Sequence, residues 1–486
     1  MKLSKIINSI QNIKTNIKEE IEINKITSDS RKIEKNDIFV AIKGENRNGN
    51  DYIESAIQSG ASVIVTDDDT KISENYKYIL VENSRSALSV ILSKYYRLNE
   101  ERMTIICITG TNGKSSTAYF LYNILRKANK CVGLISTIES MMMDERLDIN
   151  GGSSVEDLHS AMTTPDPEIL YNVLYKMKKK GVKYVVLEAS SHGVKQRKLD
   201  GLIIDFCIFT NLSMEHMDYH KTMLDYFESK EKLIKMSKSG VVNIDNPYGK
   251  CLFEKYEHMH SFSYNRPGDF FASHLSPTKY GYKFSFFSGK EIELETKIPG
   301  EFNVCNASLA ASVAVMLKIG SESIREGVLS TKVPGRMEKY KNNIYIDYAH
   351  TPFATEMVLK EIQKIEKRKN LVVLFGCGGD RDKTKREKIG AIVSKYANKI
   401  IITSDNPRNE EPLSIIREIL NGVDRRKTHI IIPSRKEAIV YGVKAMKSND
   451  VLVLLGKGHE EYEINRDGKF FFSEKRIIDK ALNNGF

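Results

Sequence analysis

The feature that most constrains the fold of this chain is the glycine loop GTNGKSS at residues 110–116. It directly follows an apolar, β-branched run at 104–108, which is typical of a buried strand. A glycine loop between a strand and a helix points backbone N–H groups at phosphate oxygens. Lys114 would then pair with the β- and γ-phosphates, and Ser115 would bind Mg²⁺. The spacing is GxxGKS, shorter than the full Walker A pattern, and the alternative interpretation is a chance glycine turn.

Apolar runs that end in small or polar residues recur along the rest of the chain. In the middle they are TIICITG, KYVVLEASS and DFCIFTNLS, and after Pro334 they are NLVVLFGCGGD, KIIITSDNPR and DVLVLLGKGHE. Helical segments lie between these runs, which predicts doubly wound parallel sheets. Ligands of open α/β sheets bind at the carboxyl ends of the strands, so each polar strand end is a site candidate.

The length of the chain and its pattern of strand-like and helical runs together predict three domains. A chain of 486 residues is too long for one hydrophobic core, because domains hold roughly 100–200 residues. Residues 1–100 carry short strand-like runs at 38–42, 62–66 and 78–81 and a helical stretch at 86–98. We therefore expect an α/β protein with a smaller N-terminal α/β domain (1–100), a central domain built on a P-loop-type doubly wound parallel sheet (101–333) and a C-terminal Rossmann-like domain (334–486).

Composition argues against several classes of protein. Hydrophobic residues make up 41% and charged residues 28%, and no apolar run reaches the ~20 residues that span a membrane. The start MKLSKIINSIQNIK lacks the apolar core of a secretory signal, so we expect a cytoplasmic protein with no membrane partner. The net charge of +11 comes without a basic block interleaved with aromatics, which favours small phosphorylated ligands over nucleic acid.

The cysteines indicate neither a disulfide framework nor a zinc knuckle, because no two of them form a CxxC pair. We expect most of them to be small buried apolar residues in a reducing compartment. The six are Cys107, Cys131, Cys207, Cys251, Cys305 and Cys377.

Two strand ends carry candidate metal ligands. Glu188 ends the strand in KYVVLEASSH, and a carboxylate at a strand tip beside a phosphate loop suits Mg²⁺, with a surface glutamate as the alternative. The strand in DFCIFTNLS is followed closely by His216, Asp218 and His220, and Lys230 lies on the next helix. The histidine pair suggests a metal, and a structural histidine is an equally good interpretation.

Ten motifs, in one order and spacing, carry a resemblance to a known family. They are GTNGKSS, TTPDP (163–167), LEASSH (187–192), FTNL–EH–DYH (209–220), FNxxNA (302–307), PGRME (334–338), DYAHTP (347–352), GCGGDRDKTKR (376–386), DNPR (405–408) and GKGHE (456–460). With Asp29-Ser30-Arg31 near the start, the chain resembles the Mur ligase family, and within it the branch that adds the third residue of the peptidoglycan stem peptide. The ATP motifs alone would also fit folylpolyglutamate synthetase, whereas the DSR, SSH, GCGGDRD and DNPR elements are much more specific.

The resemblance implies a role for each residue at a matching position. The implied catalytic set is Lys114, Glu188, His216, Lys230 and Arg336. The implied ATP contacts are Gly110, Thr111, Asn112, Gly113, Lys114, Ser115, Ser116, Asn303, Asn306, Arg336, Asp347 and His350. The residues implied for the UDP-linked substrate are Ser30, Thr163, Thr164, Ser190, Gln196 and Arg197. Those implied for the incoming amino acid are Arg386, Asp405, Asn406, Pro407, Arg408, Gly456 and Glu460.

The resemblance also implies two Mg²⁺ ions and a carbamylated lysine. The implied metal ligands are Ser115, Glu188, His216 and Lys230, the last as a carbamate formed with CO₂. A carbamate turns a cation into an oxygen ligand that a second Mg²⁺ accepts, whereas an unmodified lysine would repel that metal.

The implied reaction is the ATP-dependent addition of meso-diaminopimelate to UDP-N-acetylmuramoyl-L-alanyl-D-glutamate through an acyl phosphate. It would serve peptidoglycan synthesis, and thereby cell shape and division, and we expect a monomer. Diaminopimelate differs from lysine by one extra carboxylate, which Arg408 in DNPR is suited to bind. The alternatives are a ligase for L-lysine or for another peptide or polyglutamate acceptor, a non-catalytic nucleotide-binding protein and, for Arg408, a surface arginine in a polar turn.

Three positions depart from the family pattern. The usual Thr-x-Asp-His reads Ser213-Met214-Glu215-His216, which lengthens a carboxylate beside the expected metal site by one CH₂. The usual Gly-Thr is Ser136-Thr137. The usual Asn before the double threonine is Met162, in the expected substrate loop.

Overall fold

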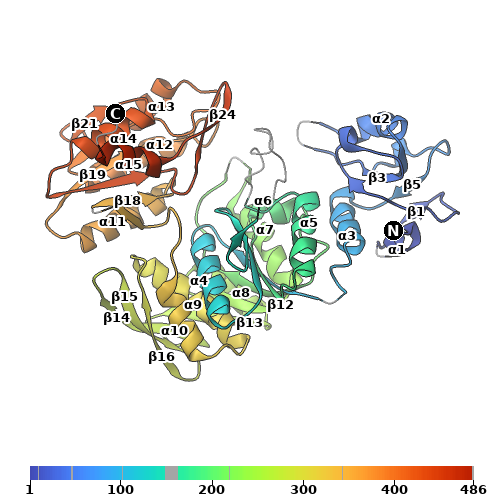
Figure 1. The fold of residues 1–486 in the computed structure, drawn as a ribbon, viewed down its shortest axis with the longest axis horizontal. Helices are drawn as coiled ribbons and strands as arrows, with labels where there is room; N and C mark the ends of the chain where they lie inside the picture. Colours follow the sequence, from blue (N-terminus) through green and yellow to red (C-terminus); the bar gives the residue numbers. More distant parts are fainter. Residues whose placement is uncertain are drawn as a thin grey trace.

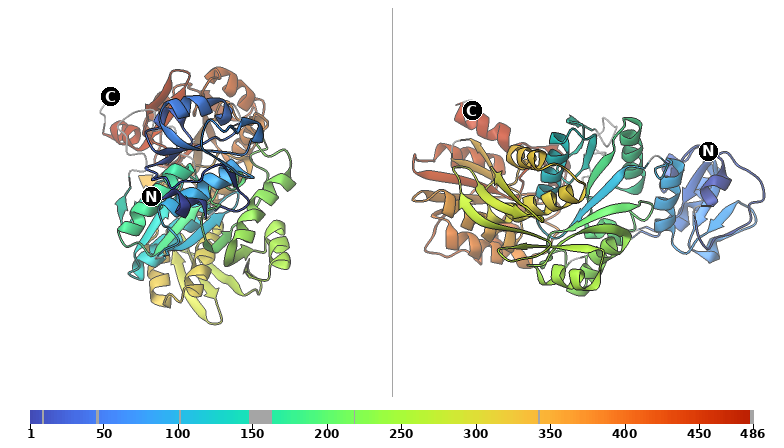
Figure 2. Two further views of the ribbon diagram at one scale, coloured as in Figure 1. Left: turned by 90° about the vertical axis from the view of Figure 1, so that its right-hand side faces the viewer. Right: turned by 90° about the horizontal axis from the view of Figure 1, so that it is seen from below.

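The computed structural model describes residues 1–8, 10–44, 47–100, 102–147, 163–217, 219–341 and 343–483. It is elongated, with the N-terminal part at one end, the C-terminal part at the other and the middle of the chain between them (Figures 1 and 2). Each part contains a sheet with helices, so the α/β fold class expected from the sequence is confirmed. Met162 and Asp218, which the sequence analysis singled out, lie outside the described residues.

In the described part of the chain, the N-terminal sheet has five strands in the order β1-β5-β4-β3-β2, and β1 alone runs antiparallel to its neighbour. The strands are β1 (Lys14–Thr15), β2 (Ile26–Thr27), β3 (Asp37–Val40), β4 (Ala61–Thr66) and β5 (Tyr78–Leu80). The helices are α1 (Leu3–Ile7), η1 (Ser30–Lys32), η2 (Gly49–Tyr52), α2 (Ile53–Gln58), η3 (Asp69–Lys71) and α3 (Ser84–Tyr95). The strand-like runs at 38–42, 62–66 and 78–81 are β3, β4 and β5, and the helical stretch at 86–98 is α3.

The central sheet has eleven strands over the described ranges, in the order β16-β15-β14-β13-β12-β11-β6-β10-β7-β8-β9. The run from β14 to β7 is parallel, and antiparallel strands extend it at both ends, which the sequence analysis did not predict. The strands are β6 (Thr104–Thr109), β7 (Val132–Ile135), β8 (Ser140–Met142), β9 (Glu145–Arg146), β10 (Tyr184–Glu188), β11 (Ile204–Phe209), β12 (Ser237–Asn243), β13 (Met259–Tyr264), β14 (Phe270–Pro277), β15 (Tyr282–Phe287) and β16 (Glu291–Thr296).

Helices cover both faces of the parallel part of this sheet. They are α4 (Lys114–Lys127), α5 (Pro167–Lys179), α6 (Ser191–Lys195), α7 (Met223–Met236), α8 (Pro247–Lys255), α9 (Glu301–Met316) and α10 (Ser321–Ser330). In β6, Ile106 and Ile108 pack with the buried residues of α4, α9 and α10, whereas Ile105 and Cys107 pack with those of α3, α5 and α7. Because both faces are covered, the central strands are apolar along their whole length.

The C-terminal sheet has six strands, counted over the described residues, in the order β17-β18-β22-β19-β20-β21, parallel except for β17. The strands are β17 (Glu338–Lys341), β18 (Ile344–Asp347), β19 (Asn370–Phe375), β20 (Lys399–Ile402), β21 (Thr428–Ile431) and β22 (Asp450–Leu455), with a separate hairpin of β23 (Tyr462–Asn465) and β24 (Gly468–Phe471). One face packs against α11 (Pro352–Ile365), α12 (Thr384–Tyr396) and α13 (Pro412–Leu420), and the other against α14 (Arg435–Lys444) and α15 (Glu474–Leu482).

The cysteines correct one expectation from the sequence. Cys107, Cys207 and Cys377 are buried, but Cys305 is half-buried and Cys131 and Cys251 are exposed. The expectation that most are buried is therefore wrong, because Cys131 lies in a turn before β7 and Cys251 on the outer side of α8. All six thiols are free. Among the described helices, none combines the length and the apolar character needed to cross a membrane.

Candidate active site

The glycine loop lies where the sequence predicted, between β6 and α4. Gly110 and Gly113 have φ values of +148° and +87°, and a side chain at either would overlap a neighbour, Thr210 in one case and Asn306 in the other. Both positions therefore require glycine. The Lys114 ammonium curls back over the loop and donates to the carbonyls of Gly110 (2.9 Å) and Thr111 (2.8 Å). The backbone thus has the strand–loop–helix form that binds phosphate.

Hydroxyl and carboxylate oxygens gather beside this loop. Glu188, at the end of β10, is fully buried, and it accepts hydrogen bonds from Ser115 Oγ (3.1 Å) and from the N–H and hydroxyl of Thr137 (both 3.1 Å). The hydroxyls of Thr137 and Thr163 are 3.0 Å apart. An all-oxygen donor set with one carboxylate fits Mg²⁺, which uses few protein ligands. The described residues contain no group of three or more His, Cys, Asp or Glu side chains arranged for a metal.

Lys230 approaches the same loop from α7. Only 1% of the residue is exposed, its ammonium donates to the carbonyl of Gly110 (2.9 Å), and the nitrogen lies 4.7 Å from the centre of the Tyr226 ring. Burial, together with the charge of Lys114, lowers the pKa of Lys230 well below its usual value. Burial thus destabilises the protonated form of this side chain relative to a lysine in water.

His216 and His220 have different surroundings. His220 is fully buried, with Nε2 2.9 Å from Ser191 Oγ and Nδ1 3.4 Å from an Asp225 oxygen, so protein partners occupy both ring nitrogens. His216 keeps 41% of its side chain exposed, and its ring lies edge-on to His192 at 5.0 Å. Desolvation, only partly offset by Glu215, lowers the pKa of His216 to about 4. His216 is therefore the member of the pair with a neutral ring available to a ligand.

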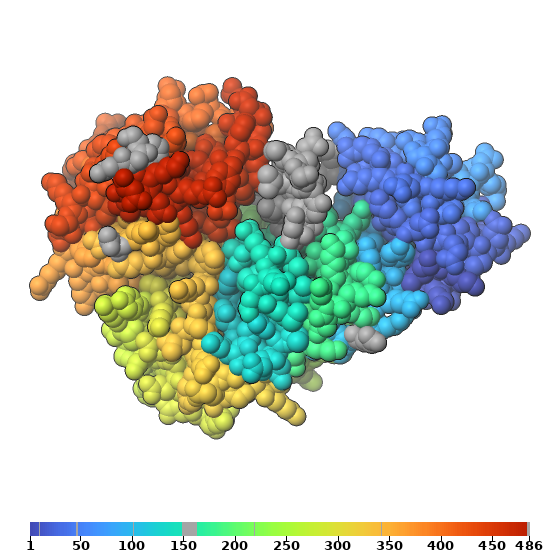
Figure 3. Space-filling model, in the orientation of Figure 1, coloured from blue at the N-terminus to red at the C-terminus, as the bar shows by residue number. Residues whose placement is uncertain are grey.

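The C-terminal sheet presents Arg336 and His350 to the phosphate loop. The guanidinium of Arg336 lies 4.2 Å from the Tyr348 ring centre, and its charge contributes to the lowered pKa of Lys114, for which burial is the main cause. His350 Nε2 lies 3.4 Å from Glu215 Oε1, across the boundary between the two parts of the chain that touch in Figure 3. The longer side chain of Glu215, noted as a departure from the family pattern, thus reaches the C-terminal part.

Asp347, which the resemblance places among the ATP contacts, is held by main-chain partners. Its two carboxylate oxygens accept the N–H groups of Met337 (2.6 Å) and Ala349 (2.7 Å), and only 5% of the residue is exposed. It therefore shapes the turn that carries Arg336 rather than facing open space.

The two asparagines of α9 form one buried group behind the phosphate loop. Asn306 Nδ2 donates to Asn303 Oδ1 (3.1 Å), and Asn303 Nδ2 donates to the Pro299 carbonyl (2.7 Å). Asn306 also packs on Gly113. The residues expected on the adenine side therefore lie against the loop itself.

Most of the residues expected to hold the UDP-linked substrate lie at the carboxyl end of β10. Thr164 Oγ1 accepts the N–H of Ser190 (2.9 Å) and lies 3.2 Å from the Ser190 hydroxyl, next to Thr163 and Glu188. Ser190 is the N-cap and Gln196 the C-cap of the helix α6. Ser30 lies in the N-terminal part, in η1.

Arg197 points away from this group, toward Asp200 at 3.2 Å. The next residue, Lys198, is only 3% exposed and reaches Asp166 (2.7 Å) and the Thr164 carbonyl (3.3 Å). Lys198 was not singled out from the sequence, since nothing in a run of QRK says which cation turns inward.

The DNPR turn follows β20 and is held on three sides. Asn406 donates to Glu460 Oε2 (2.9 Å) and accepts from Lys457 (2.8 Å) and from the N–H of Ile464 in β23 (3.0 Å). Asp405 Oδ1 is buried, lies 3.4 Å from Lys457 Nζ and has no hydrogen-bond partner among the described residues. Burial alone would raise the pKa of Asp405, but the charges of Lys457 and Arg435 hold it below its usual value.

Arg408 ends the DNPR turn with an unusual backbone, at φ +51°. Its guanidinium donates to the carbonyls of Gly379 (2.8 Å) and Asn406 (3.4 Å), and no acidic side chain of the described residues forms an ion pair with it. Burial and the neighbouring charge of Arg381 lower its pKa. A half-buried guanidinium without a carboxylate partner is suited to bind one from a ligand.

Arg386, which the sequence analysis assigned to the amino acid, is engaged elsewhere. It is fully buried and pairs with Glu410 (2.8 Å) and Glu418 (2.9 Å). Arg381, in the same motif, lies beside Arg408 across Gly378. Both arginines thus lie against Gly378, where Arg381 is beside Arg408, whereas Arg386, on the buried side of α12, donates to the Gly378 carbonyl (3.1 Å) and is already paired with two glutamates.

Comparison with known proteins matches three successive parts of the chain to one family. Residues 22–96 match the model described as Mur ligase family, catalytic domain, residues 108–314 match Mur ligase middle domain, and residues 335–458 match Mur ligase, glutamate ligase domain. A protein of Caldanaerobacter subterraneus subsp. tengcongensis named UDP-N-acetylmuramoyl-L-alanyl-D-glutamate–2,6-diaminopimelate ligase is 36% identical over 98% of this chain and 99% of its own length. This chain belongs to the Mur ligase family. The resemblance seen in the sequence is thereby confirmed.

Other similar proteins of the Mur ligase family agree with this assignment. A ligase of the same name from Aquifex aeolicus is 37% identical over 94% of this chain and 93% of its own length. A solved structure of a ligase with that name matches with a TM-score of 0.67 and 26% identity over 95% of both chains. A MurF ligase from Thermotoga maritima in complex with ADP shares the fold, with a TM-score of 0.62 and 18% identity over 95% of this chain and 99% of that one.

In this Mur ligase a buried ion pair lies beneath the DNPR turn. Arg435 and Glu474 are 1% and 2% exposed and pair at 2.8 Å. The same guanidinium donates to the carbonyls of Ser404 (3.2 Å) and Leu455 (2.8 Å), which precede the turns after β20 and β22. Arg435 thus ties the ends of two strands that carry candidate substrate residues.

Replacing Arg435 with methionine is expected to lower the free energy of unfolding by about 3–5 kcal/mol, because Glu474 would remain buried without its cation. The midpoint of urea unfolding measures the change. Arg426→Met is the control, since the Arg426 side chain is 90% exposed in its pair with Asp424, and its loss should change stability by less than about 0.5 kcal/mol. Equal shifts in the two variants would contradict the prediction.

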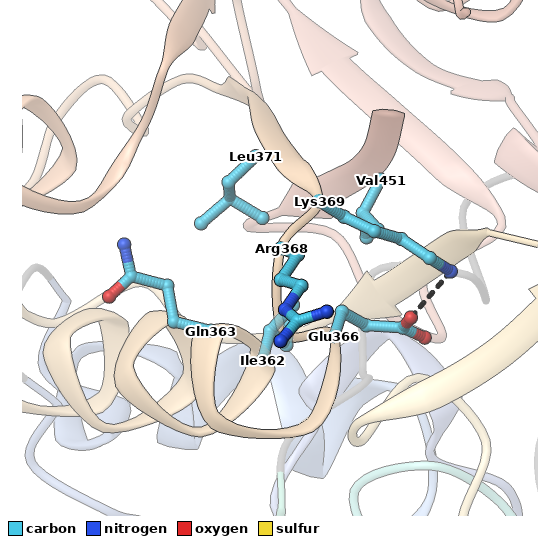
Figure 4. A pocket seen from close by; sticks show the side chains of 7 residues that line it. All are labelled: Ile362, Gln363, Glu366, Arg368, Lys369, Leu371 and Val451. Carbon is cyan, nitrogen blue, oxygen red and sulfur yellow. Dashed lines mark hydrogen bonds and ion pairs between the residues drawn. The ribbon is translucent and has the colours of Figure 1, made fainter. Parts of the chain in front are cut away.

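One pocket of this Mur ligase lies away from the candidate site. It has a volume of about 240 Å³ and is lined by Ile362, Gln363, Glu366, Arg368, Lys369, Leu371 and Val451 (Figure 4). Leu371 and Val451 are near the amino ends of β19 and β22, whereas the candidate site is at the carboxyl ends of these strands. The pocket therefore belongs to the opposite edge of the sheet.

Proposed function

We propose that this Mur ligase adds meso-diaminopimelate to UDP-N-acetylmuramoyl-L-alanyl-D-glutamate at the expense of ATP, as a step of peptidoglycan precursor synthesis. The observation that carries the proposal is Arg408, a half-buried guanidinium beside the DNPR turn with no acidic partner in the described residues. Relatives with this activity in their names match nearly the whole chain at 35–37% identity, which supports it.

The substrate amino acid would be held at both ends. Arg408, with Arg381 beside it, would bind the distal carboxylate that distinguishes diaminopimelate from lysine. Asp405 Oδ1 lies near Lys457 but accepts no hydrogen bond from the described residues, and it would accept one from a substrate ammonium, since a buried oxygen without a hydrogen bond is costly. The other residues proposed to contact the amino acid are Asn406, Pro407, Gly456 and Glu460. The charge of Arg386 is already neutralised by Glu410 and Glu418.

The first chemical step would join the D-glutamate carboxylate to the γ-phosphorus of ATP. A carboxylate oxygen forms the new P–O bond as ADP leaves, which gives an acyl phosphate; the amine of the incoming amino acid then attacks the carbonyl carbon and phosphate departs. Lys114 and Arg336 would offset the charge on the transferred phosphoryl group, where positioning and electrostatics do most of the work.

Two groups of oxygen and nitrogen donors fit Mg²⁺, which would neutralise phosphate charge when bound. The first is Ser115 with Glu188 and Thr137, and the second is His216 with Lys230 as a carbamate. The neutral form of an amine is the form that adds to CO₂, with release of one proton; the lowered pKa of the buried Lys230 favours this form, and the resulting carboxylate would supply an oxygen ligand. The match to the family lysine supports this assignment.

Closure of the C-terminal part over the central part would exclude water from the acyl phosphate, which water would otherwise hydrolyse. The contact of Glu215 with His350 supports such a closed arrangement, and so do the influence of Thr137 on the pKa of His459 and that of Arg336 on the pKa of Lys114. Asn303, Asn306 and His350 would lie on the ATP side, and Asp347 would act through the Arg336 turn.

The same proposal covers domains, assembly and location. The domains would be residues 1–100 for the UDP end, 101–333 for ATP and 334–486 for the amino acid, in line with the three family matches. The proposed assembly is a monomer. The nucleotide substrates point to the cytoplasm.

The test is a phosphate-release assay with UDP-N-acetylmuramoyl-L-alanyl-D-glutamate, ATP and a panel of amino acids. We expect turnover with meso-diaminopimelate and little with L-lysine or L-ornithine. Turnover with L-lysine as the best substrate would refute the specificity, and no turnover with any amino acid would refute the acceptor.

Lys114→Ala is expected to reduce ATP turnover by at least about 10²–10³-fold, because one preorganised cation on the transferred phosphate is lost. The far-UV circular dichroism spectrum should not change. Lys127→Ala, at the exposed far end of the same helix, is the control and should keep wild-type turnover. Near-normal turnover in Lys114→Ala would overturn the phosphate-loop assignment.

A further inference from the structure

Glu168 joins the central part of the chain to the N-terminal part. It lies in the first turn of α5, and its carboxylate accepts three hydrogen bonds from the N-terminal part. The donors are the hydroxyl of Thr27 (2.9 Å) and the N–H and hydroxyl of Ser28 (2.8 and 2.9 Å). One side chain thus holds two consecutive residues of another sheet-containing unit.

Those two residues lead directly into the turn with Ser30. The hydroxyl of Thr27, a fully buried residue, also accepts the N–H of Asp29 (3.1 Å), and Asp29 caps η1, the short helix that contains Ser30. A shift of Ser28 would therefore move Ser30 as well. Glu168 consequently determines where this turn stands relative to the central sheet.

The segment that carries Glu168 also carries the contacts at the other end of the UDP-linked substrate. Thr163 lies against Thr137, and Thr164 holds Ser190. Two residues further on, Asp166 pairs with the buried Lys198 at 2.7 Å. Pro165 and Pro167 restrict the backbone of this segment, so its ends keep a constant separation.

We propose that Glu168 is a positioning residue that sets the distance between the Ser30 turn and the sugar–diphosphate contacts at Thr163, Thr164 and Ser190. The inference rests on the proposed function, because it takes the substrate to be a UDP-linked molecule that bridges the two parts. A ligand held at two ends gains affinity only when the spacing of the two sites matches its own length. Loss of the Glu168 contacts lets the turn move and reduces that gain.

Other contacts keep the N-terminal part attached when Glu168 is replaced. In α3, Ser86 donates to Asp200 (2.9 Å) and Ser89 to the Arg197 carbonyl (2.9 Å), and the rings of Tyr96 and Tyr175 lie 5.1 Å apart. These contacts are separate from the Ser30 turn. The variants should therefore fold and keep their domain arrangement near α3.

The first experiment measures steady-state kinetics of Glu168→Ala and Glu168→Gln. Alanine should raise KM for the UDP-linked dipeptide by roughly 10-fold or more, while KM for ATP and for the amino acid and kcat stay within about 2-fold. Glutamine should stay near wild type, because its amide oxygen accepts from Ser28 and its nitrogen donates to Thr27 Oγ1. Ser86→Ala is the matched control and should leave every constant unchanged.

The second experiment separates positioning from local folding of the turn. Calorimetric titration of Glu168→Ala with the full UDP-linked dipeptide should show weaker binding, whereas the affinity for uridine alone should not change. An equal loss for both ligands would mean that Glu168 only shapes the turn, and this would overturn the proposal, as would unchanged binding of the full ligand. Failure of the wild type to bind the full ligand would instead refute the proposed function.

Discussion

Arg408→Ala is expected to abolish the preference for meso-diaminopimelate over L-lysine. A site that desolvates a polar group for one partner rejects an analogue without that partner by roughly 10⁴-fold, and the Arg408 guanidinium has only two backbone carbonyls as partners in the described residues. In the variant, kcat/KM for meso-diaminopimelate should fall by about this factor and that for L-lysine should not. The measurement is kcat/KM for both amino acids in the two proteins.

Two further variants make this test specific. Arg381→Ala should also lower kcat/KM for meso-diaminopimelate, because Arg381 lies beside Arg408. Arg466→Ala, on the exposed turn of the adjacent hairpin, should have no effect. A wild type that prefers lysine, or an Arg408→Ala enzyme with an unchanged preference, would reject the specificity while leaving the ligase assignment intact.

Lys230→Ala is expected to lose activity by about 10³-fold or more, since the variant cannot form the proposed carbamate and so would lose its charge and its oxygen ligand for Mg²⁺. The wild-type enzyme should lose activity in buffer freed of CO₂ and regain it with bicarbonate. Short carboxylic acids should partly restore Lys230→Ala, because they offer the missing carboxylate. Enzyme equilibrated with ¹³CO₂ should give a carbamate NMR signal that the variant lacks.

The structure supplies a matched control for this prediction. Lys232 lies on the same helix two residues further on, but it pairs with Asp200 at 2.9 Å and is 32% exposed, so Lys232→Ala should keep near-normal activity. Full activity of Lys230→Ala without CO₂ would reject the carbamate.

The sequence predicted several of the parallel strands but missed others, such as β12 and β13, and it predicted none of the antiparallel strands at the two ends of the central sheet. The strands β6, β10, β11, β19, β20 and β22 were recognisable because a parallel strand buried on both faces is apolar throughout. The extension β14–β16 went unpredicted, since strands such as β16, with exposed and buried residues in alternation, do not stand out among polar segments.

Site residues on a local backbone motif were easier to predict from the sequence than side chains whose orientation depends on a partner distant in sequence. The loop at 110–116 has its form because two glycines and a strand–helix junction lie together in the sequence, and Ser115 and Glu188 meet because β6 and β10 are neighbours. Arg381 and Arg386 look alike in GCGGDRDKTKR, but Glu410 and Glu418 draw only Arg386 inward. Arg197 and Lys198 are a similar case, because Arg197 pairs with Asp200 and Lys198 pairs with Asp166.

By itself, the sequence determined the family, the three-part α/β architecture and the strand ends at which ligands are expected, because these follow from local hydrophobic pattern and from motifs of a few residues. The tertiary structure alone decided that Arg386 pairs with Glu410 and Glu418, that Asp347 shapes a turn, and that Glu168 holds Thr27 and Ser28. Each of these depends on partners distant in sequence, and burial and charge pairing select among side chains that are chemically equivalent along the chain.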